Sequence, residues 1–234
     1  MALKLVYISE PLIESGVIRI RDDEHRHLAV ARAELNEAIE LFDGRGKVWT
    51  AAITAVDRRE TLAQVTGNRL VPPDPYELIL GQSLVRASAF EFALEKAVET
   101  GVTRIVPMLA ARSNVKDARR QDRWQKIILE AAKQSKRYHL PTLEEPVAFE
   151  QVLHMDARTR IVFAEHSGIE LKPAIAGSPV LYLIGPEGGW TDAELESAQT
   201  SGFALVGLGP TILRSETAAV VATALLRYEL RNAH

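Results

Sequence analysis

Leu-Ile-Gly-Pro-Glu-Gly-Gly-Trp at residues 183–190 and Leu-Gly-Pro-Thr-Ile-Leu-Arg-Ser-Glu-Thr at residues 208–217 are the two stretches that decide the fold. Each follows an apolar run typical of a buried strand, and each carries Gly-Pro where that strand should turn. The second stretch then opens a helix-like run over 218–228. Open α/β sheets bind ligands outside the carboxyl ends of their strands. We therefore predict that the two stretches form one pocket at the edge of a sheet.

Composition limits the class of protein. The chain has 234 residues, of which 47% are hydrophobic and 25% are charged, as in globular proteins of one large or two small domains. It has no apolar run of about eighteen residues, so no membrane span is expected, and its first residues do not resemble a signal peptide. Cysteine is absent, which excludes disulfides, thiolate metal sites and a cysteine nucleophile. We expect a cytoplasmic protein.

The N-terminal part is rich in short β-type runs. They lie at 4–9, 17–20, 38–42, 48–56 and 62–66, with one expected helix at 27–35. Asp-Gly-Arg-Gly at 43–46 is typical of a hairpin turn. Three prolines within 72–75 cannot lie inside a helix or a central strand. We predict a small β-barrel over 1–70 and a proline-rich linker over 71–75.

The remainder, 76–234, alternates between strand and helix patterns. Strands are expected at 78–84, 104–109, 160–165, 180–184 and 204–208. Helices are expected at 89–100, 122–138 and 218–231, with capping boxes at Ser88 and Thr191 and stops at Gly101 and Gly202. Such alternation predicts βαβ units and a parallel sheet.

The usual catalytic and metal motifs are missing. The sequence has no Gly-x-Gly-x-x-Gly after a strand, no Walker loop, no His-Glu-x-x-His and no Gly-x-Ser-x-Gly. His25 and His27 have the spacing of neighbours that face different ways on a helix, and no third ligand is apparent. We interpret both as surface histidines and expect no metal site.

Basic residues gather between Arg112 and His139. Nine basic residues stand there against three acidic ones, whereas six basic residues face twelve acidic ones from Leu140 onward. This asymmetry permits a basic stripe along nucleic-acid phosphates, with binding that weakens steeply as salt rises. The alternative is a solvated helix face.

The Gly185–Gly189 turn permits two interpretations. It could simply link a strand to a helix, or it could bring backbone amides close to a polar ligand. Ser215 is a candidate N-cap, whereas Arg214 and Glu216 beside a strand end are costly to bury without partners. Converging polar groups at a glycine-lined edge favour a binding site.

A polar stripe follows the helix expected at 122–138. Glu130, Gln134 and Arg137 are spaced at i, i+4 and i+7, beside an apolar stripe. They form either a surface ladder of weak pairs or a polar strip that flanks the pocket.

The two quoted stretches resemble the signature of the SPOUT superfamily, and more closely the RsmE-type 16S ribosomal RNA (uracil-N3)-methyltransferases. Support comes from Glu-Thr-Gly-Val at 99–102, Arg-Ser at 112–113, Gln-Ser-Lys-Arg at 134–137 and Leu-Phe-Asp-Gly at 41–44. The resemblance therefore spans nearly the whole chain. The chain departs from it at 35–38, where a Gly-Asp turn is usual, and at 85–88, where a lysine-glycine pair is common.

The resemblance implies an α/β fold. It consists of a C-terminal SPOUT-type domain with a trefoil knot and a parallel sheet, plus an N-terminal PUA-like RNA-binding β-barrel. It also implies S-adenosyl-methionine in the knot, a homodimer, no membrane and no metal. The substrate would be 16S rRNA within the small ribosomal subunit, at uracil-1498. Cofactor contacts are expected from Leu183, Ile184, Gly185, Pro186, Glu187, Gly188, Leu208, Gly209, Ile212 and Leu213.

The absence of cysteine narrows the chemistry. The covalent route usual for carbon-5 methylation of pyrimidines is closed, which leaves a ring nitrogen or a ribose hydroxyl. Methylation at uracil N3 requires proton removal and stabilisation of the resulting anion. We predict that Arg214 stabilises this anion, with Arg137 as the second candidate. The group that accepts the proton would be Glu130 or Glu216. RNA contacts are expected from Arg26, Arg32, Arg112, Lys116, Lys133 and Lys136.

Three alternatives remain at this point. The first is a SPOUT methyltransferase that acts on another RNA or on ribose 2′-oxygen. The second is a non-catalytic RNA-binding assembly factor that has kept the fold. The third is a regulator that binds nucleotides through 185–189.

Overall fold

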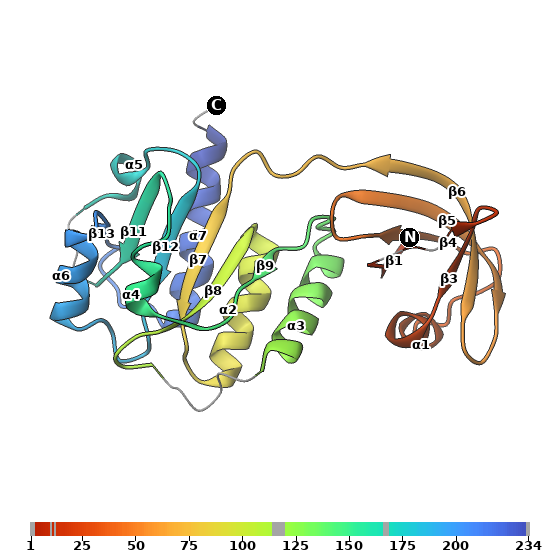
Figure 1. Ribbon diagram of the computed structural model, residues 1–234, viewed down its shortest axis with the longest axis horizontal. Helices are drawn as coiled ribbons and strands as arrows, with labels where there is room; N and C mark the ends of the chain where they lie inside the picture. The colour runs from red at the N-terminus through yellow and green to blue at the C-terminus, as the bar shows by residue number, and fades with distance from the viewer. Residues whose placement is uncertain (1–2, 10, 12, 114–119, 166–168, 233–234) are drawn as a thin grey trace. The chain divides into compact units, whose positions relative to one another are not determined.

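The computed structural model describes residues 3–9, 11, 13–113, 120–165 and 169–232 (Figure 1). The chain divides into two compact units. The N-terminal unit comprises Met1–Pro73 together with Ala132–Leu140, and the C-terminal unit comprises Asp74–Ala131 together with Pro141–His234. Each unit is considered by itself below.

The N-terminal unit is built on a six-stranded sheet. Its strands follow the order β1-β4-β5-β6-β3-β2, in which only the β1–β4 pair is parallel. Buried aliphatic residues such as Val6, Ile39 and Ile53 fill its core. The strands are β1 (Lys4–Tyr7), β2 (Ile13–Glu14), β3 (Val17–Ile20), β4 (Ala38–Phe42), β5 (Lys47–Val56) and β6 (Thr61–Leu70).

The helix of this unit lies earlier than predicted. α1 spans Asp22–Val30 rather than 27–35. Three acidic residues occupy its first turn, where the positive end of the helix dipole stabilises them. Arg32 and Asn36 both have positive φ, so the chain leaves the helical conformation soon after Val30.

The hairpin between β4 and β5 is confirmed. The Asp43 carboxylate accepts hydrogen bonds from the backbone N–H groups of Arg45 and Lys47, at 2.8 and 3.1 Å. Gly46 has φ +94°, and a Cβ there would lie 2.5 Å from the carbonyl oxygen of Val71. Only glycine therefore fits this position.

The helix predicted over 122–138 is shorter than expected, since α3 spans Gln121–Gln134. Lys136 has φ +54° and ends the helical course, while the N–H of Arg137 turns back to the carbonyl of Ala132 at 2.8 Å. The chain then pairs with the β4–β5 turn. The N–H of Gly46 donates to the carbonyl of Tyr138 at 3.0 Å, and the N–H of Leu140 donates to that of Gly44 at 2.9 Å. Tertiary pairing has replaced the last helical turn.

The C-terminal unit contains the predicted parallel sheet. Its order is β10-β8-β7-β12-β11-β13, with β9 paired to β8, and every pairing is parallel. All five residues of β12 are buried, as in strands covered on both faces. The strands are β7 (Leu78–Ser83), β8 (Arg104–Leu109), β9 (Thr142–Leu143), β10 (Val147–Ala148), β11 (Thr159–Phe163), β12 (Val180–Ile184) and β13 (Ala204–Val206).

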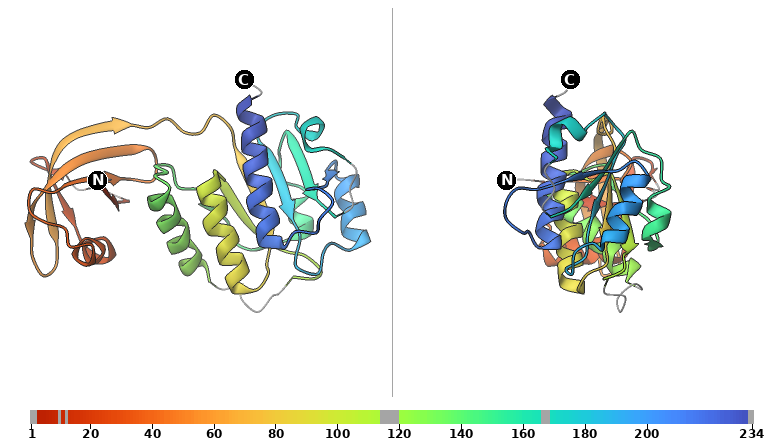
Figure 2. Two further views of the ribbon diagram at one scale, coloured as in Figure 1. Left: turned by 180° about the vertical axis from the view of Figure 1, so that it is seen from behind. Right: turned by 90° about the vertical axis from the view of Figure 1, so that its left-hand side faces the viewer.

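Helices cover both faces of this sheet. α2 and α7 lie side by side on one face, and α4 lies on the other, as Figure 2 shows. Besides α3, the helices of this unit are α2 (Ala87–Thr100), α4 (Phe149–Val152), α5 (Leu171–Ala174), α6 (Asp192–Thr200) and α7 (Ser215–Asn232).

The predicted helix ends have mixed outcomes. The capping box at Thr191 is confirmed, because its hydroxyl accepts from the Glu194 N–H and the Glu194 carboxylate accepts from the Thr191 N–H. Gly101 ends α2 with φ +114°. The capping box at Ser88 is wrong. α2 begins two residues earlier than expected, at Ala87, with Arg86 at the N-cap position and no side-chain cap.

Candidate active site

The two quoted stretches line one cavity of about 700 Å³. The first follows the end of β12 at Ile184, and the second follows the end of β13 at Val206. β11 lies between these two strands, so all three carboxyl ends meet at one edge of the sheet. Besides the two loops, the cavity is lined by Arg86, Arg112, Phe163, Ala164, Glu165 and Leu195. The prediction of a single pocket at this edge is confirmed.

Glycine lets the first loop pass close to an indole ring. A Cβ on Gly185 would lie 2.9 Å from the ring of Trp190. That ring cannot move freely, because its Nε1 donates to the carbonyl of Phe163 at 2.9 Å and it packs on Phe149 with the ring centroids 5.4 Å apart. The glycine therefore keeps the cavity wall thin at this point.

Arg112 holds the other end of the first loop. Its Nη1 donates to the carbonyl oxygens of Gly188 and Trp190, at 2.7 and 3.4 Å. A second arginine, Arg86, forms an ion pair of 2.8 Å with Glu187 at the cavity lining. Arg112, predicted as an RNA contact, is thus also a support of the loop.

Two charged residues of the second stretch line the cavity, and neither side chain has a partner among the described residues. Among the described residues, no hydrogen bond or ion pair is found for the Arg214 guanidinium, which is exposed. The Oε2 atom of Glu216 is buried and lacks a hydrogen-bond partner within the same part of the chain. A buried carboxylate oxygen in this state is costly, and it stands ready to accept a hydrogen bond or a proton.

Ser215 differs from its predicted role. It is the first residue of α7, so Arg214 takes the position before the helix. The Arg214 carbonyl accepts from the Ala218 N–H at 2.8 Å. The Ser215 hydroxyl instead donates to the carbonyl of Gly185 at 2.6 Å. Ser215 therefore joins the start of α7 to the first loop.

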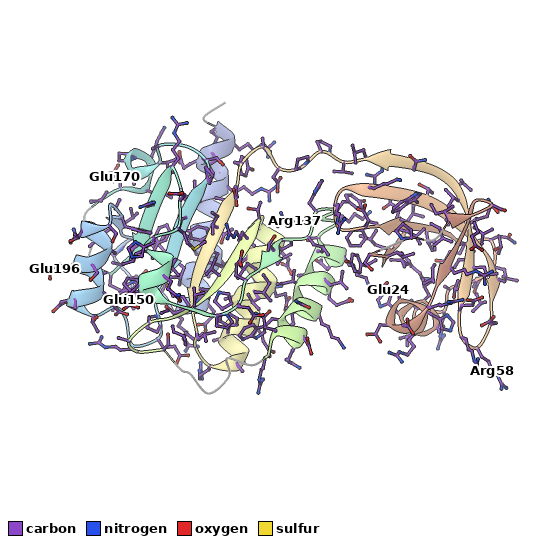
Figure 3. The ribbon with its side chains drawn as sticks, in the orientation of Figure 1. Glu24, Arg58, Arg137, Glu150, Glu170 and Glu196 are labelled. Carbon is purple, nitrogen blue, oxygen red and sulfur yellow. The ribbon has the colours of Figure 1, made fainter. Side chains whose placement is uncertain are left out.

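Several predicted site residues are not among those that line this cavity. Leu183 is buried inside β12, and neither Glu130 nor Arg137 is among the lining residues. Glu130 is exposed on α3, and Arg137 follows α3 within the segment that belongs to the N-terminal unit (Figure 3).

The predicted RNA contacts occupy varied surroundings. Arg26 pairs with Asp23 on α1, and Arg32 and Lys136 are exposed. Lys133 is buried, and its Nζ lies 3.0 Å from a carboxylate oxygen of Glu24. Lys116 lies outside the described residues.

The histidine prediction is half wrong. His27 is exposed, but His25 is buried, with Nδ1 2.9 Å from the hydroxyl of Thr61. Within the described ranges no group of three histidine, cysteine or acidic residues is placed to hold a metal ion. No helix in those ranges has the length and apolar character needed to cross a membrane.

Sequence reasoning missed Arg86, Phe163 and the supporting role of Trp190. Phe163 ends β11, and Arg86 lies between β7 and α2, so both are far in sequence from the two quoted stretches and are brought to the cavity by the fold. Trp190 ends the first quoted stretch, and its fixed place after two glycines was the available signal.

The fold and this cavity define the class of protein, an RNA methyltransferase. The family model of the RNA methyltransferase domain matches residues 72–227, and that of the RNA methyltransferase PUA domain matches residues 20–66. The chain is 32% identical to ribosomal RNA small subunit methyltransferase E of a Synechocystis species, with 96% of this chain and 77% of that protein covered. Against the protein of that name from Mycobacterium tuberculosis the identity is 32%, with 95% and 90% covered.

Solved structures agree with this family. A ribosomal RNA small subunit methyltransferase E from Neisseria gonorrhoeae, bound to S-adenosyl methionine, is 33% identical with a TM-score of 0.90, covering 97% of this chain and 98% of that one. A putative methyltransferase from Legionella pneumophila in complex with the same cofactor is 27% identical with a TM-score of 0.91, at the same coverage. The chain belongs to the ribosomal RNA small subunit methyltransferase E family, as its motifs predict.

Proposed function

We propose that this chain transfers the methyl group of S-adenosyl-methionine to N3 of a uracil in 16S rRNA, at uracil-1498 by family. The observation that carries the proposal is the single cavity lined by both glycine-containing loops. Relatives of the same fold and similar length have been solved with this cofactor bound. The small ribosomal subunit is the proposed partner, and a ribosomal substrate implies a cytoplasmic location.

The residues of the cavity fit the cofactor. A volume of about 700 Å³ is in the range of pockets that enclose a nucleoside-sized ligand. The thin wall at Gly185 and the left-handed backbone of Gly209, with φ +107°, allow the main chain to approach such a ligand. When bound, the cofactor supplies an electrophilic methyl group on a sulfonium. The residues that would hold it are Ile184, Gly185, Pro186, Glu187, Gly188, Leu208, Gly209, Ile212 and Leu213, with Leu183 behind them.

The chain's own chemistry is assigned to two neighbours. Arg214 would stabilise the uracil anion, because a guanidinium presents several donors and stays charged. Glu216 would take the N3 proton. Its buried Oε2 without a partner supports this role over Glu130, which is exposed and does not line the cavity. Arg137 remains the second candidate for the anion.

The N-terminal unit is proposed as the RNA-binding part. Its match to the PUA model supports a domain over 1–70, a linker over 71–75 and a methyltransferase domain over 76–234. We further propose that its curved sheet, visible in Figure 1, closes into a small barrel. RNA would be held by Arg26, Arg32, Arg112, Lys116, Lys133 and Lys136.

A trefoil knot and a homodimer belong to the same proposal. The return of the chain from β13 through residues 207–214 to α7, which packs against β7 and β12, supports the knot. Phe92 on α2 and Leu225 and Tyr228 on α7 are apolar and exposed, at 45%, 42% and 65%. Adjacent helices with such side chains support a dimer face.

The test is methyl transfer from labelled cofactor into purified small subunits, followed by mapping of the modified base. Transfer to N3 of one uracil is expected. Label in another RNA or on a ribose would support the first alternative. Calorimetric titration separates the other two alternatives. A non-catalytic factor would give no heat with the cofactor, and a nucleotide-binding regulator would respond to nucleoside phosphates instead.

Trp190, which lines the cavity, gives a second binding signal through its fluorescence.

A further inference from the structure

A chain of buried hydrogen bonds runs beneath the cavity. Gln82, the fifth residue of β7, is fully buried, and its Nε2 donates to the hydroxyl of Ser215 at 3.0 Å. The Ser215 hydroxyl donates in turn to the carbonyl oxygen of Gly185 at 2.6 Å. Three segments are thereby joined: β7, the first loop after β12, and the residue that follows the second loop.

The direction of this chain is fixed. The Gln82 amide also donates to the carbonyl of Ser83 at 3.1 Å, so its nitrogen must face that carbonyl and the Ser215 oxygen together. A flipped amide would place two oxygens against each other at Ser83. Ser215 must therefore accept from Gln82, and its single proton is left for Gly185.

Gly185 precedes Pro186, which has no N–H. The Gly185 carbonyl is then the one polar group of that peptide unit, and Ser215 holds it at a short distance. The N–H of Gly189 closes the same loop onto the carbonyl of Pro186 at 2.9 Å. Rotation of the Gly185–Pro186 peptide would break the bond to Ser215 and move the cavity wall.

We propose that Ser215 is a positioning residue, which sets the spacing between the two cofactor loops and, through its neighbour Arg214, the place of the anion-stabilising group. The inference rests on the proposed function. Ser215 itself needs no contact with cofactor or uracil. Loss of its hydroxyl would leave the Gly185 carbonyl and the Gln82 amide without their partner, and both loops would be free to separate.

The same helix provides a matched control. Thr223, further along α7, has a buried hydroxyl 2.7 Å from the Tyr182 hydroxyl, and it donates to the carbonyl of Ala219 at 2.6 Å. It does not line the cavity. Thr223→Val therefore removes a buried hydrogen bond of comparable kind without touching either loop.

The experiment compares Ser215→Ala, Ser215→Thr and Thr223→Val in the full chain. Calorimetry and Trp190 fluorescence give Kd for S-adenosyl-methionine, thermal unfolding gives Tm, and methyl transfer to small subunits gives kcat. Ser215→Ala should raise Kd about tenfold, as expected for loss of a buried hydrogen bond, and should also lower kcat. Ser215→Thr should restore Kd to within about threefold of wild type, because the hydroxyl is retained. Thr223→Val should lower Tm but leave Kd unchanged.

A pH series adds a readout that a general loss of stability would not give. The Gln82 amide, the Ser215 hydroxyl and the Gly185 carbonyl do not change protonation between about pH 6 and 9. The ratio of wild-type to Ser215→Ala activity should therefore stay constant over that range. A constant ratio with a raised Kd supports the inference. A Ser215→Ala variant that loses only Tm, as Thr223→Val does, overturns it.

Gln82→Met provides a second test of the inference if Ser215→Ala does not fold. It removes the donor that directs the Ser215 hydroxyl while leaving that hydroxyl in place, and should raise Kd about threefold. An unchanged Kd in a folded Gln82→Met protein also overturns the inference. Failure of the wild type to bind S-adenosyl-methionine would instead defeat the proposed function, so the two failures are distinguishable.

Discussion

The two units of the molecule treat charged side chains differently. One example of a paired charge in the N-terminal unit is Arg69, whose Nη2 lies 2.8 Å from a carboxylate oxygen of Glu40; the other oxygen of Glu40 accepts from the Tyr138 hydroxyl at 3.0 Å. At the cavity of the C-terminal unit, within the described residues, the guanidinium of Arg214 and the buried Oε2 of Glu216 have no such partner.

This difference separates structural charges from functional ones. A paired charge gains its stabilisation from the partner, so it has little left to offer a ligand. A buried carboxylate oxygen without a partner costs free energy, and folded proteins keep such groups mainly where a ligand or a reaction uses them. The same residue types thus support folding where they are paired and are available for chemistry where the cavity leaves them unpaired.

The largest expected effect is at Arg214. Arg214→Ala should lower kcat by about 10²–10³-fold, as loss of one preorganised anion donor does in other enzymes. The side chain is exposed, so Tm should change little. Arg231→Ala, at an exposed position near the end of α7, the helix that Arg214 precedes, is the matched control. Near-normal methyl transfer by Arg214→Ala would remove Arg214 from the role.

The next effect is expected at Glu216. Glu216→Gln keeps the shape of the side chain but cannot take a proton, and should lower kcat by about 100-fold. Because the Oε2 atom is buried without a partner, the neutral amide should leave Tm equal or higher. Single-turnover methyl transfer with saturating cofactor measures the change. Unaltered turnover would exclude Glu216 as the proton acceptor and favour Glu130.

Two glycines of the first loop test the thin cavity wall. A Cβ at Gly185 would meet the fixed ring of Trp190 at 2.9 Å, whereas a Cβ at Gly188 would meet only the flexible side chain of Arg112, at 3.2 Å. Gly185→Ala should raise Kd for S-adenosyl-methionine about tenfold, and Gly188→Ala by less. Calorimetry measures both. Equal effects would mean that Trp190 yields as easily as Arg112.

A change in the N-terminal unit should lower stability without affecting cofactor binding. Lys133→Met leaves the Glu24 carboxylate, half-buried on α1 (Figure 3), without the ammonium group 3.0 Å away. The free energy of unfolding should fall by about 1 kcal/mol, and the double variant with Glu24→Leu should recover part of it. Kd for the cofactor should not change. A lowered cofactor affinity would break the contrast between the units.

The smallest effect concerns a paired charge of the C-terminal unit. The hydrogen bond from Arg123 holds the pKa of Glu91 below its usual range. Because the pKa is lower in the folded state, the ionised carboxylate stabilises the fold fully at pH values above the unfolded pKa. That stability is lost as pH falls through the folded pKa. Glu91→Gln should therefore lower Tm by about 2 °C at neutral pH, and this difference should shrink as pH falls below the unfolded pKa of about 4.3 and vanish only below the lower folded pKa. Equal Tm differences at both pH values would contradict the pairing.

Local sequence was sufficient for much of the site. Gly-Pro after an apolar run marks where β12 ends and the chain turns, and the resemblance of both loops to one signature identified the cofactor. The parallel sheet followed from the alternation of strand and helix patterns, because each element carries its own periodicity.

What failed was set by partners distant in sequence. Helix patterning could not end α3 at Gln134, because the pairing of Tyr138 and Leu140 with the β4–β5 turn replaces the last turn. The capping propensity of Ser88 is not used, because α2 already begins at Ala87, with Arg86 at the N-cap position. The bond between Gln82 and Ser215 joins residues far apart in the chain, so no local pattern contains it.

The segment Ala132–Leu140 has a practical consequence for dissecting this protein. A gene cut at the prolines near residue 73 would yield an N-terminal fragment deprived of Lys133, Tyr138 and His139, each of which bonds to a group within that fragment. Glu24, Glu40 and the Val71 carbonyl would face water in place of these partners. Deletion studies of this chain should therefore use a graft in which the 132–140 stretch is fused back to the N-terminal portion.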